Sequence, residues 1–251
     1  VSDWSSDVCS SDLAAIVDTG GIDSAKRAEL DKRAKALGAA SFLCIDGKGP
    51  MVERVVRYLI AGNVRRGNAY PLCVAAERAI QAQLVVEHAK KIGAKFLAHG
   101  STGAGNDQVR FEVAIRALAP EVEPLAPVRD LGLTREQEIA SLEKWGLSQH
   151  LAPGAKAAYS INRGLWGTTI GGRETSTSDK PLPEEAWVTT VSPARAPDTP
   201  LKLTLSFDKG MPVAVDGKKM DAVKLIEKLE ELGGAHGIGR GVHLGDTIIG
   251  I

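Results

Sequence analysis

The sequence has 251 residues and carries 31 basic and 31 acidic side chains, so its formal net charge is zero. This balance argues against binding nucleic acid or an anionic membrane through bulk electrostatics and makes small molecules the expected partners. No apolar run approaches the roughly 20 residues that cross a bilayer, and the start has no signal-peptide pattern. We therefore expect a cytoplasmic protein.

Cysteine and histidine spacing gives no support to a disulfide framework or a metal centre. His236, His243 and Asp246 form the one grouping that could bind a metal, and their Gly-rich surroundings favour a turn instead. The cysteines are too widely spaced for a C-x-x-C pair, which predicts reduced thiols. They are Cys9, Cys44 and Cys73.

The first 13 residues differ in composition and hydrophobic pattern from everything that follows. They read VSDWSSDVCSSDL, repeat Ser-Ser-Asp without apolar periodicity, and resemble translated sequencing-adapter sequence. We expect residues 1–13 to be non-native and set them apart from the fold.

Residues 14–150 alternate short apolar runs with amphipathic stretches, which is typical of βαβ units around a parallel sheet. The pattern predicts strands at 14–17, 41–45 and 95–98, with the last one buried. It predicts helices at 23–37, 51–63, 72–92, 106–118 and 134–145. The first part of the chain is therefore expected to be an α/β domain.

Three of these helices carry more detailed expectations. The helix at 72–92 should bury a stripe, and the helix at 106–118 should face inward through every fourth residue. Thr134 should cap the helix at 134–145, with Gln137 reaching back to complete a capping box. The predicted inward residues are Ala76, Ile80, Leu84 and Ile92 on the first of these helices and Val109, Val113 and Ala117 on the second.

Residues 151–251 have a different composition and are expected to form a second, α+β domain. Gly, Pro, Ser and Thr are frequent up to about residue 200. A half-buried strand is predicted at 201–207, a short partner strand at 212–215, and an amphipathic helix at 220–232.

The segment from His99 to Glu112, HGSTGAGNDQVRFE, carries the clearest functional pattern. Its glycines follow a strand and lead into a helix, where free backbone N–H groups favour an anion. Asn106 and Arg110 lie one helical turn apart and Asp107 lies beside them, so together with Thr102 they could hold a zwitterionic amino acid. The alternative is a solvated helix start in which Asn106 is a cap and Asp107 pairs locally with Arg110.

This segment resembles the central motif of argininosuccinate synthases, and three further segments agree with that family in order and spacing. They are VDTGG at 17–21, AYPLC at 69–73 and YSINRGLWGTTIGG at 159–172. The resemblance covers about residues 14–251. It implies a nucleotide-binding domain of the adenine nucleotide alpha hydrolase (ATP pyrophosphatase) type at 14–150 and a catalytic and multimerisation synthetase domain at 151–251.

The resemblance also implies a role for each matching residue. ATP would be contacted by Val17 and Gly100; aspartate by Thr102, Asn106 and Asp107; citrulline by Tyr70, Asn106, Arg110, Ser160 and Thr169. Thr169 stands where many members have serine, and Ala75 where some have a serine that touches citrulline. From local sequence alone, Tyr70 could equally close a turn, and Ser160 and Thr169 would be loop residues.

The implied reaction is the ATP-dependent condensation of citrulline with aspartate. The ureido oxygen of citrulline attacks the α-phosphate of MgATP to give citrullyl-AMP and pyrophosphate, and the aspartate amine then displaces AMP. Positioning and charge stabilisation carry such a reaction, so no general base or other catalytic residue is nominated. The family role would be arginine biosynthesis or the urea cycle, and the family is usually a homotetramer.

Two pieces of the family pattern are not found in the sequence. They are the Ser-Gly-Gly-x-Asp-x-Ser loop with its strand, and the glutamate and tyrosine near the far end that contact citrulline. In such sheets that strand lies between those at 14–17 and 95–98, so we expect two open edges and an inactive, insoluble or molten fragment. Another ATP pyrophosphatase-type ligase and a non-catalytic nucleotide-binding module are the alternative functions.

Overall fold

The computed structural model describes residues 12–103, 105–150, 159–177 and 179–243. In the first part the strands are β1 (Leu13–Asp18), β2 (Ser41–Asp46), β3 (Phe96–Ala98) and β4 (Glu123–Leu125). The helices are α1 (Ser24–Ala36), α2 (Lys48–Met51), a π-helical turn (Val52–Val56), α3 (Arg57–Ala61), α4 (Cys73–Ile92), α5 (Asp107–Leu118), α6 (Pro127–Asp130) and α7 (Arg135–Lys144), followed by a 3₁₀ turn (Ser148–His150).

In the second part β5 (Ser160–Gly164) and β6 (Gly167–Gly171) form an antiparallel hairpin. A small antiparallel sheet and a long helix follow: β7 (Leu205–Asp208), β8 (Met211–Val215), β9 (Lys218–Lys219) and α8 (Ala222–Ala235). Three 3₁₀ turns lie between the hairpin and this sheet, at Arg173–Ser176, Glu184–Ala186 and Pro193–Arg195. The predicted combination of an α/β part and an α+β part is confirmed.

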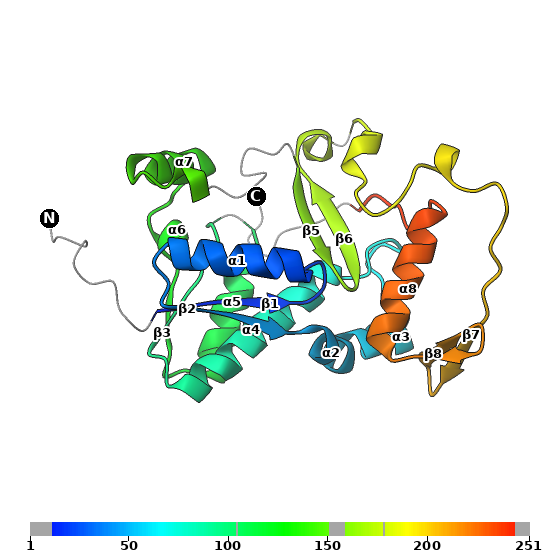
Figure 1. Ribbon diagram of the computed structural model, residues 1–251, viewed down its shortest axis with the longest axis horizontal. Coiled ribbons are helices and arrows are strands. Elements are labelled where there is room, and N and C mark those ends of the chain that lie inside the picture. The colour runs from blue at the N-terminus through cyan, green and yellow to red at the C-terminus, as the bar shows by residue number, and fades with distance from the viewer. Residues whose placement is uncertain (1–11, 104, 151–158, 178, 244–251) are drawn as a thin grey trace, which may run out of the picture.

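The parallel sheet is present as two separate pairs. β1 pairs in parallel with β2, with Leu13 opposite Ser41, and β3 pairs in parallel with β4. Within the described residues no strand joins β1 to β3, so each has one paired edge. Figure 1 shows α1 on one side of the β1–β2 pair and α4 on the other, with α5 beside α4. β1 begins at Leu13, one residue before the predicted fold begins.

The main core lies where α4 packs against β1 and the helical segment before it. Met51 and Val56 are fully buried there, and Ile80 and Leu84 of α4 pack against them together with Leu165 of the hairpin. A second cluster forms between α4 and α5 around Val86 and Ile115. Apolar burial of this kind stabilises by about 25 cal/mol per Å² removed from water. Because α4 contributes residues to both clusters, it joins them.

Three predictions about packing are wrong in detail. Val113 and Ala117 are exposed, because α5 turns Ile115 and the following Ala119 toward Val86 and Ala89 of α4 instead. Ile92, at the last turn of α4, is exposed because the helix runs past the core there.

The two predicted half-buried or buried strands also differ. In β3 only Leu97 is buried, since Phe96 and Ala98 lie on the opposite face of the strand from Leu97. β7 begins at Leu205, four residues later than predicted, and all its residues are exposed because no described layer covers it. The buried side of that sheet is β8, through Ala214 and Val215.

Helix ends follow the local sequence closely. Asp23 caps α1 by accepting from the Lys26 N–H at 2.7 Å, and Asp221 caps α8 in the same way from Lys224. The predicted capping box of Thr134 with Gln137 is confirmed in both directions. Such caps contribute about 1 kcal/mol each.

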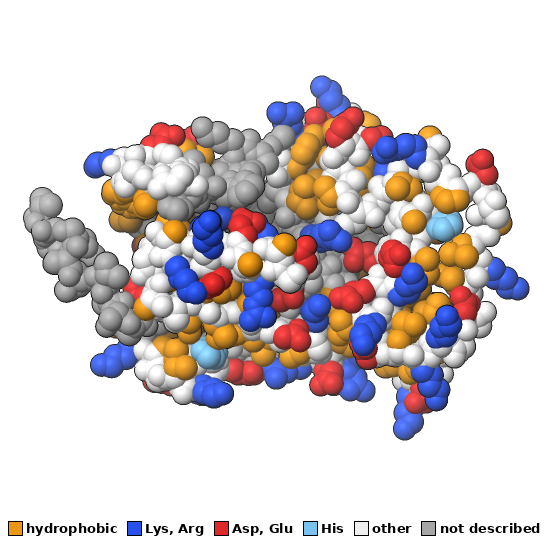
Figure 2. All heavy atoms as spheres, in the orientation of Figure 1, with side chains coloured by type: hydrophobic (Ala, Val, Ile, Leu, Met, Phe, Trp, Pro, Cys, Tyr) orange, Lys and Arg blue, Asp and Glu red, His pale blue; other side chains and the backbone are white. Residues whose placement is uncertain are grey.

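The described surface is mixed in charge. On the face in Figure 2, Lys and Arg side chains lie among Asp and Glu side chains without a large area of one sign. Among the described helices none is long and apolar enough to span a bilayer.

Candidate active site

A cavity of about 1540 Å³ lies between β1, β3, the starts of α4 and α5, and the β5–β6 hairpin. Residues of β1 and β3 line it on one side, including Val17 and Leu97, so it occupies the space between the two strand pairs. Four segments that the sequence analysis singled out therefore meet at one place, at the carboxyl ends of parallel strands where ligands bind in α/β folds.

The 17–21 loop is fitted to the hairpin by backbone contacts. The N–H of Leu165 donates to the carbonyl of Thr19 at 2.8 Å, and the Gly20 N–H donates to the Asp18 carboxylate at 2.9 Å. Gly20 has φ of +117°, and a Cβ there would overlap the backbone of Leu165. Only glycine allows this approach, which brings the hairpin against β1.

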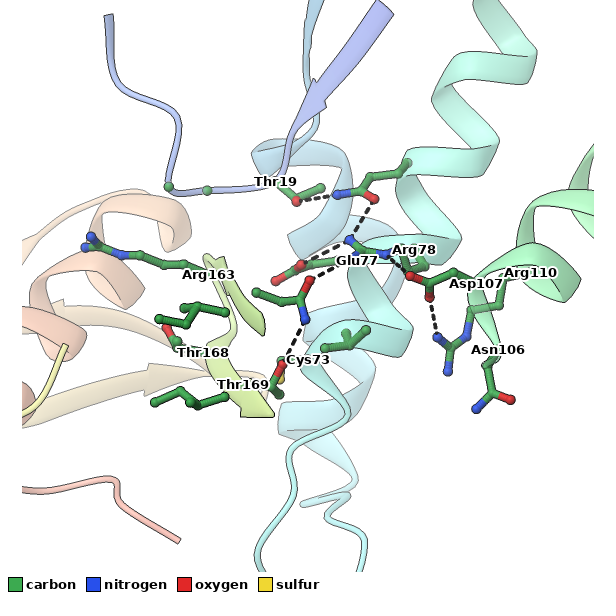
Figure 3. Close-up of a pocket in the computed structure, with 18 of the residues that line it drawn as sticks. Thr19, Cys73, Glu77, Arg78, Asn106, Asp107, Arg110, Arg163, Thr168 and Thr169 are labelled. Atoms are coloured by element: carbon green, nitrogen blue, oxygen red, sulfur yellow. Dashed lines mark hydrogen bonds and ion pairs between the residues drawn. The ribbon is translucent and has the colours of Figure 1, made fainter. Parts of the chain in front are cut away.

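Arg78 lies at the centre of the polar side of the cavity (Figure 3). Its guanidinium donates to Asp107 Oδ2, to Gln81 Oε1 and to Asn162 Oδ1, each at 3.0 Å. These contacts tie α4 to α5 and to β5, which are distant in sequence. The planar guanidinium suits such a role because its donors are fixed in a fork.

The hydrogen bonds continue on both sides of Arg78. Gln81 donates to the Thr19 hydroxyl at 3.1 Å, and Asn162 donates to the Thr169 hydroxyl at 3.4 Å. The network therefore runs without interruption from the loop after β1, through α4, to β6. We call this set of hydrogen-bonded side chains the polar network; its members are Thr19, Arg78, Gln81, Asp107, Arg110, Asn162 and Thr169.

Asp107 is held by two arginines. Its Oδ1 accepts from Arg110 Nη1 at 2.9 Å, while its Oδ2 accepts from Arg78. The local Asp107–Arg110 pairing of the alternative interpretation is thus present, but the Asp107 side chain also remains 40% exposed toward the cavity. A half-exposed carboxylate fixed by two cations can still accept from a ligand's ammonium group.

Asn106 occupies the N-cap position of α5 and makes no capping hydrogen bond through its side chain. It lines the cavity together with Thr102 and Gly100. In Figure 3 its amide points away from the Arg78 side of the network. The capping role of the alternative interpretation is therefore wrong for this residue.

Most of the candidate site residues meet in this cavity. Those that line it are Val17, Tyr70, Gly100, Thr102, Asn106, Asp107, Arg110 and Thr169. Ser160 does not line it; it is exposed at the first position of β5, opposite Gly171. Val17 is only 5% exposed and packs in the main core, so it presents little surface to a ligand.

Tyr70 closes a turn with Arg66, through backbone hydrogen bonds of 2.8 and 3.0 Å, and its side chain is fixed as well. Its hydroxyl accepts from the Val74 N–H at 3.1 Å, and its ring stacks on His243 at 4.7 Å between centroids. His243 and Arg240 belong to a segment that also lines the cavity, and Arg240 is fixed by two hydrogen bonds of 2.9 Å to Glu184. The far end of the described chain thus returns to the site.

The predicted metal alternative finds no support in the described residues. His236 Nδ1 contacts the Leu232 carbonyl at 2.9 Å at the end of α8, whereas His243 stacks on Tyr70. Asp246 lies outside the described residues. No group of three or more His, Cys, Asp or Glu suited to a metal ion occurs in the part of the chain that the structure describes.

Sequence reasoning missed the residues at the centre of the site. Arg78, Gln81 and Glu77 lie on the first turns of α4, and Asn162 lies on β5. The signal in the sequence was Glu77, an acidic residue next to Arg78 that lies one helical turn from Cys73 and from Ile80 on the apolar stripe.

Glu77 is the most perturbed of these groups. It is 3% exposed, and burial raises the pKa of its carboxyl to about 7, with Asp107 adding to the rise and Arg78 opposing it. Buried titratable groups with shifted pKa values are concentrated at functional sites. The hydroxyl of Thr168, another buried group lining the cavity, makes no hydrogen bond in the structure.

Comparison with known families matches both parts of the chain. Residues 4–148 match the family model described as "Arginosuccinate synthase N-terminal HUP domain", and residues 159–251 match "Arginosuccinate synthase C-terminal domain". The first match alone covers more than half of the 251 residues.

Curated relatives give the same result. Proteins named argininosuccinate synthase from Sulfolobus acidocaldarius and Pyrococcus furiosus are each 40% identical, over 98% and 95% of this chain, and cover 61% and 57% of the relatives' own length. One from Chlorobium limicola is 36% identical over 99% of the chain and 62% of the relative. The chain thus spans about 60% of the length of these relatives. With both domain matches in chain order, the chain belongs to the argininosuccinate synthase family.

Proposed function

We propose that the protein is an ATP-dependent carbon–nitrogen ligase that condenses citrulline with aspartate to argininosuccinate. The observation that supports it best is the convergence of the 99–112 segment, the start of α4 and the β5–β6 hairpin on one cavity. The reaction would pass through citrullyl-AMP and release AMP and pyrophosphate. Its pathway role would be arginine biosynthesis, with the urea cycle as the alternative.

In this proposal aspartate and citrulline bind in the cavity beside the polar network. Asp107, fixed by Arg78 and Arg110, accepts from the ammonium of aspartate, with Thr102 and Asn106 beside it. Arg110 and Asn106 also hold citrulline together with Tyr70 and Thr169. Ser160 is the weakest of the proposed citrulline contacts, because it does not line the cavity.

ATP would lie toward β1 and β3, where Gly100 and the end of β1 at Val17 line the cavity. Gly100 has no atom within 4 Å of the position its Cβ would take, so there is room beside it for a nucleotide. Mg²⁺ would enter with the phosphates as part of the substrate. The reaction depends on orienting the ureido oxygen and the α-phosphate rather than on a protein nucleophile.

The two alternative functions fit less well. Ligases that thiolate tRNA or transfer ammonia through a thiolate need a reactive cysteine, whereas burial raises the pKa of both Cys44 and Cys73 and so disfavours the thiolate. Cys9 lies outside the described residues. A nucleotide-binding module without catalysis would have no use for the Arg78–Asp107–Arg110 arrangement.

The partners we propose are the three small molecules, with a homotetramer as the assembly and the cytoplasm as the compartment. Nucleic acid and membranes are not proposed partners, since the formal charge is balanced.

Product formation tests the function. An intact homologue should form AMP and pyrophosphate from ATP only when citrulline and aspartate are both present. Asp107→Asn should weaken aspartate binding about thirtyfold, because a hydrogen bond to a charged group contributes about 2 kcal/mol. AMP release without citrulline, or with tRNA as the required substrate, would refute the proposal.

A further inference from the structure

Glu77 is a buried carboxylate of α4 to which the proposed reaction assigns no role. It lines the cavity and is 3% exposed, and its Oε1 makes no hydrogen bond in the structure. In Figure 3 it lies on the hairpin side of Arg78, opposite Asp107. A carboxylate in this setting costs several kcal/mol unless a neighbouring cation offsets it, so its presence beside the polar network calls for a function.

Gly164 makes room for the Glu77 side chain. A Cβ at position 164 would overlap Oε1 of Glu77, so the carboxylate occupies the volume that a side chain on β5 would otherwise fill. Gly164 is itself buried and does not need a positive φ. The glycine is therefore required by the carboxylate rather than by the backbone.

The one cation close to Glu77 is already engaged elsewhere among the described residues. Arg78 Nη1 lies 3.8 Å from Glu77 Oε2, farther than its 3.0 Å hydrogen bonds to Gln81, Asn162 and Asp107. Glu77 thus acts on the network through charge more than through a directed bond.

The charges that face Glu77 come from three elements. Arg78 lies on α4 itself, and Asp107 with its partner Arg110 lies on α5. Tyr70 and Cys73 at the start of α4 are neutral, since burial raises the pKa of both. Arg163 of the hairpin is exposed and is screened by solvent.

With Glu77 ionised, the cluster of Glu77, Arg78, Asp107 and Arg110 has no net charge. With Glu77 protonated it carries one positive charge. The binding affinity of a ligand with a net negative charge depends on that difference in charge, whereas the affinity of a zwitterion without net charge depends on it much less.

We infer that Glu77, packed against Gly164 and next to Arg78, is a specificity-determining residue of the cavity. Its charge sets the net charge of the polar network and therefore the relative affinity of the cavity for anionic and for neutral amino acids. The inference rests on the proposed function for the identity of the two ligands, aspartate with a net charge of −1 and citrulline with none. It adds a residue outside those that the family resemblance implies.

Binding measurements on the two amino acids test this directly. Isothermal titration of aspartate from pH 6 to pH 8 should show its affinity falling by about fivefold, the effect of one added charge in a partly screened site. The affinity for citrulline should stay within twofold. Glu77→Gln should remove the dependence on pH for aspartate and keep the tighter, low-pH affinity, because its amide fills the same volume without a charge.

The matched control is Glu230→Gln. Burial also raises the pKa of Glu230, on α8, but this residue lies outside the main cavity. Its replacement should leave both affinities and their pH profiles unchanged. A general loss of structure would weaken both ligands together and so would not imitate the expected change in their ratio.

A second test examines the contact between the Glu77 carboxylate and Gly164 without any ligand. Gly164→Ala should lower the urea midpoint of unfolding, and Glu77→Ala in the same chain should restore part of that loss, because the added methyl then has space. Independent, additive effects of the two substitutions would overturn the inference.

The binding results separate the two proposals. If the unaltered protein binds both amino acids with the same pH profile, or if Glu77→Gln leaves the aspartate-to-citrulline ratio unchanged, the inference fails and the proposed function stands. If neither amino acid binds, the proposed function fails and the inference with it.

Discussion

The two sides of the cavity are built in different ways. On the α4–α5 side, charged and amide side chains hold one another in a continuous network centred on Arg78. On the β1–β3 side, the lining is strand backbone and apolar side chains such as Val17 and Leu97, and each strand has one paired edge within the described residues. The polar side is already organised without a ligand, which favours binding because less ordering is required.

The largest expected effect is on the polar side, from Arg78→Ala. This change would leave Glu77 and Asp107 without their shared cation and should lower the free energy of unfolding by about 4 kcal/mol at pH 8, as for broken buried ion pairs. Aspartate binding should be lost as well. Urea denaturation and titration calorimetry measure the two effects.

The control for that prediction is an exposed ion pair, Arg54 with Glu87 at 2.8 Å. Arg54→Ala should change stability by less than about 1 kcal/mol. Equal losses for the two arginines would mean that the network contributes no more than a surface contact.

The second prediction concerns pH. The pKa of Glu77 is raised from 4.5 to about 7 in the folded protein, so the folded state holds this proton more tightly than the unfolded state. Stability from this group is therefore full below pH 4.5, falls as the pH rises toward 7, and is constant above it. The total fall is roughly 3 kcal/mol, from 1.36 kcal/mol per unit of pKa.

Comparison with Glu77→Gln isolates this contribution, since all other groups titrate alike in both proteins. The difference in stability between the variant and the unaltered protein should move by roughly 3 kcal/mol in favour of the variant between pH 4.5 and pH 8. A constant difference would show that Glu77 is not protonated near neutral pH.

On the strand side, Val17→Ala should have a moderate effect of a different kind. Removing two buried carbon atoms from the main core should cost about 1.5 kcal/mol of stability, measured by urea unfolding. ATP affinity should fall, while aspartate affinity, measured where the variant is fully folded, should stay within twofold. A fall in aspartate affinity alone would mean that the two sides of the cavity are not separable.

The smallest effect is expected at the hairpin. Thr169→Ala removes the hydroxyl that accepts from Asn162 and should weaken citrulline binding about fivefold, from about 1 kcal/mol for a neutral hydrogen bond. Ser160→Ala should have less effect, because Ser160 is exposed and does not line the cavity. The reverse order in titration calorimetry would favour the family correspondence over the geometry.

Local features of the fold could be predicted from the sequence because they depend on neighbours in the chain. The cap at Thr134 follows from a side-chain oxygen that reaches the N–H group three residues later. The 99–112 segment was identified as a site from its glycines and polar spacing, and the structure places most of its residues in the cavity.

Packing across the chain could not be predicted in the same way. Val113 has the right spacing for an inward face of α5, yet the position of α4 decides that Ile115 is buried instead. β7 alternates in sequence, but alternation does not say whether a second layer covers the strand.

The sequence alone determined the family, the order of the two parts and the loop in which the ligand-facing residues cluster, because these depend on residue identity and short spacing. The tertiary structure alone decided that Arg78 links α5 to β5, that Glu77 fills the space left by Gly164, and that Ser160 stays outside the cavity. These depend on contacts between segments more than 25 residues apart, as from Arg78 to Asp107 and to Asn162, and no local pattern encodes such distances.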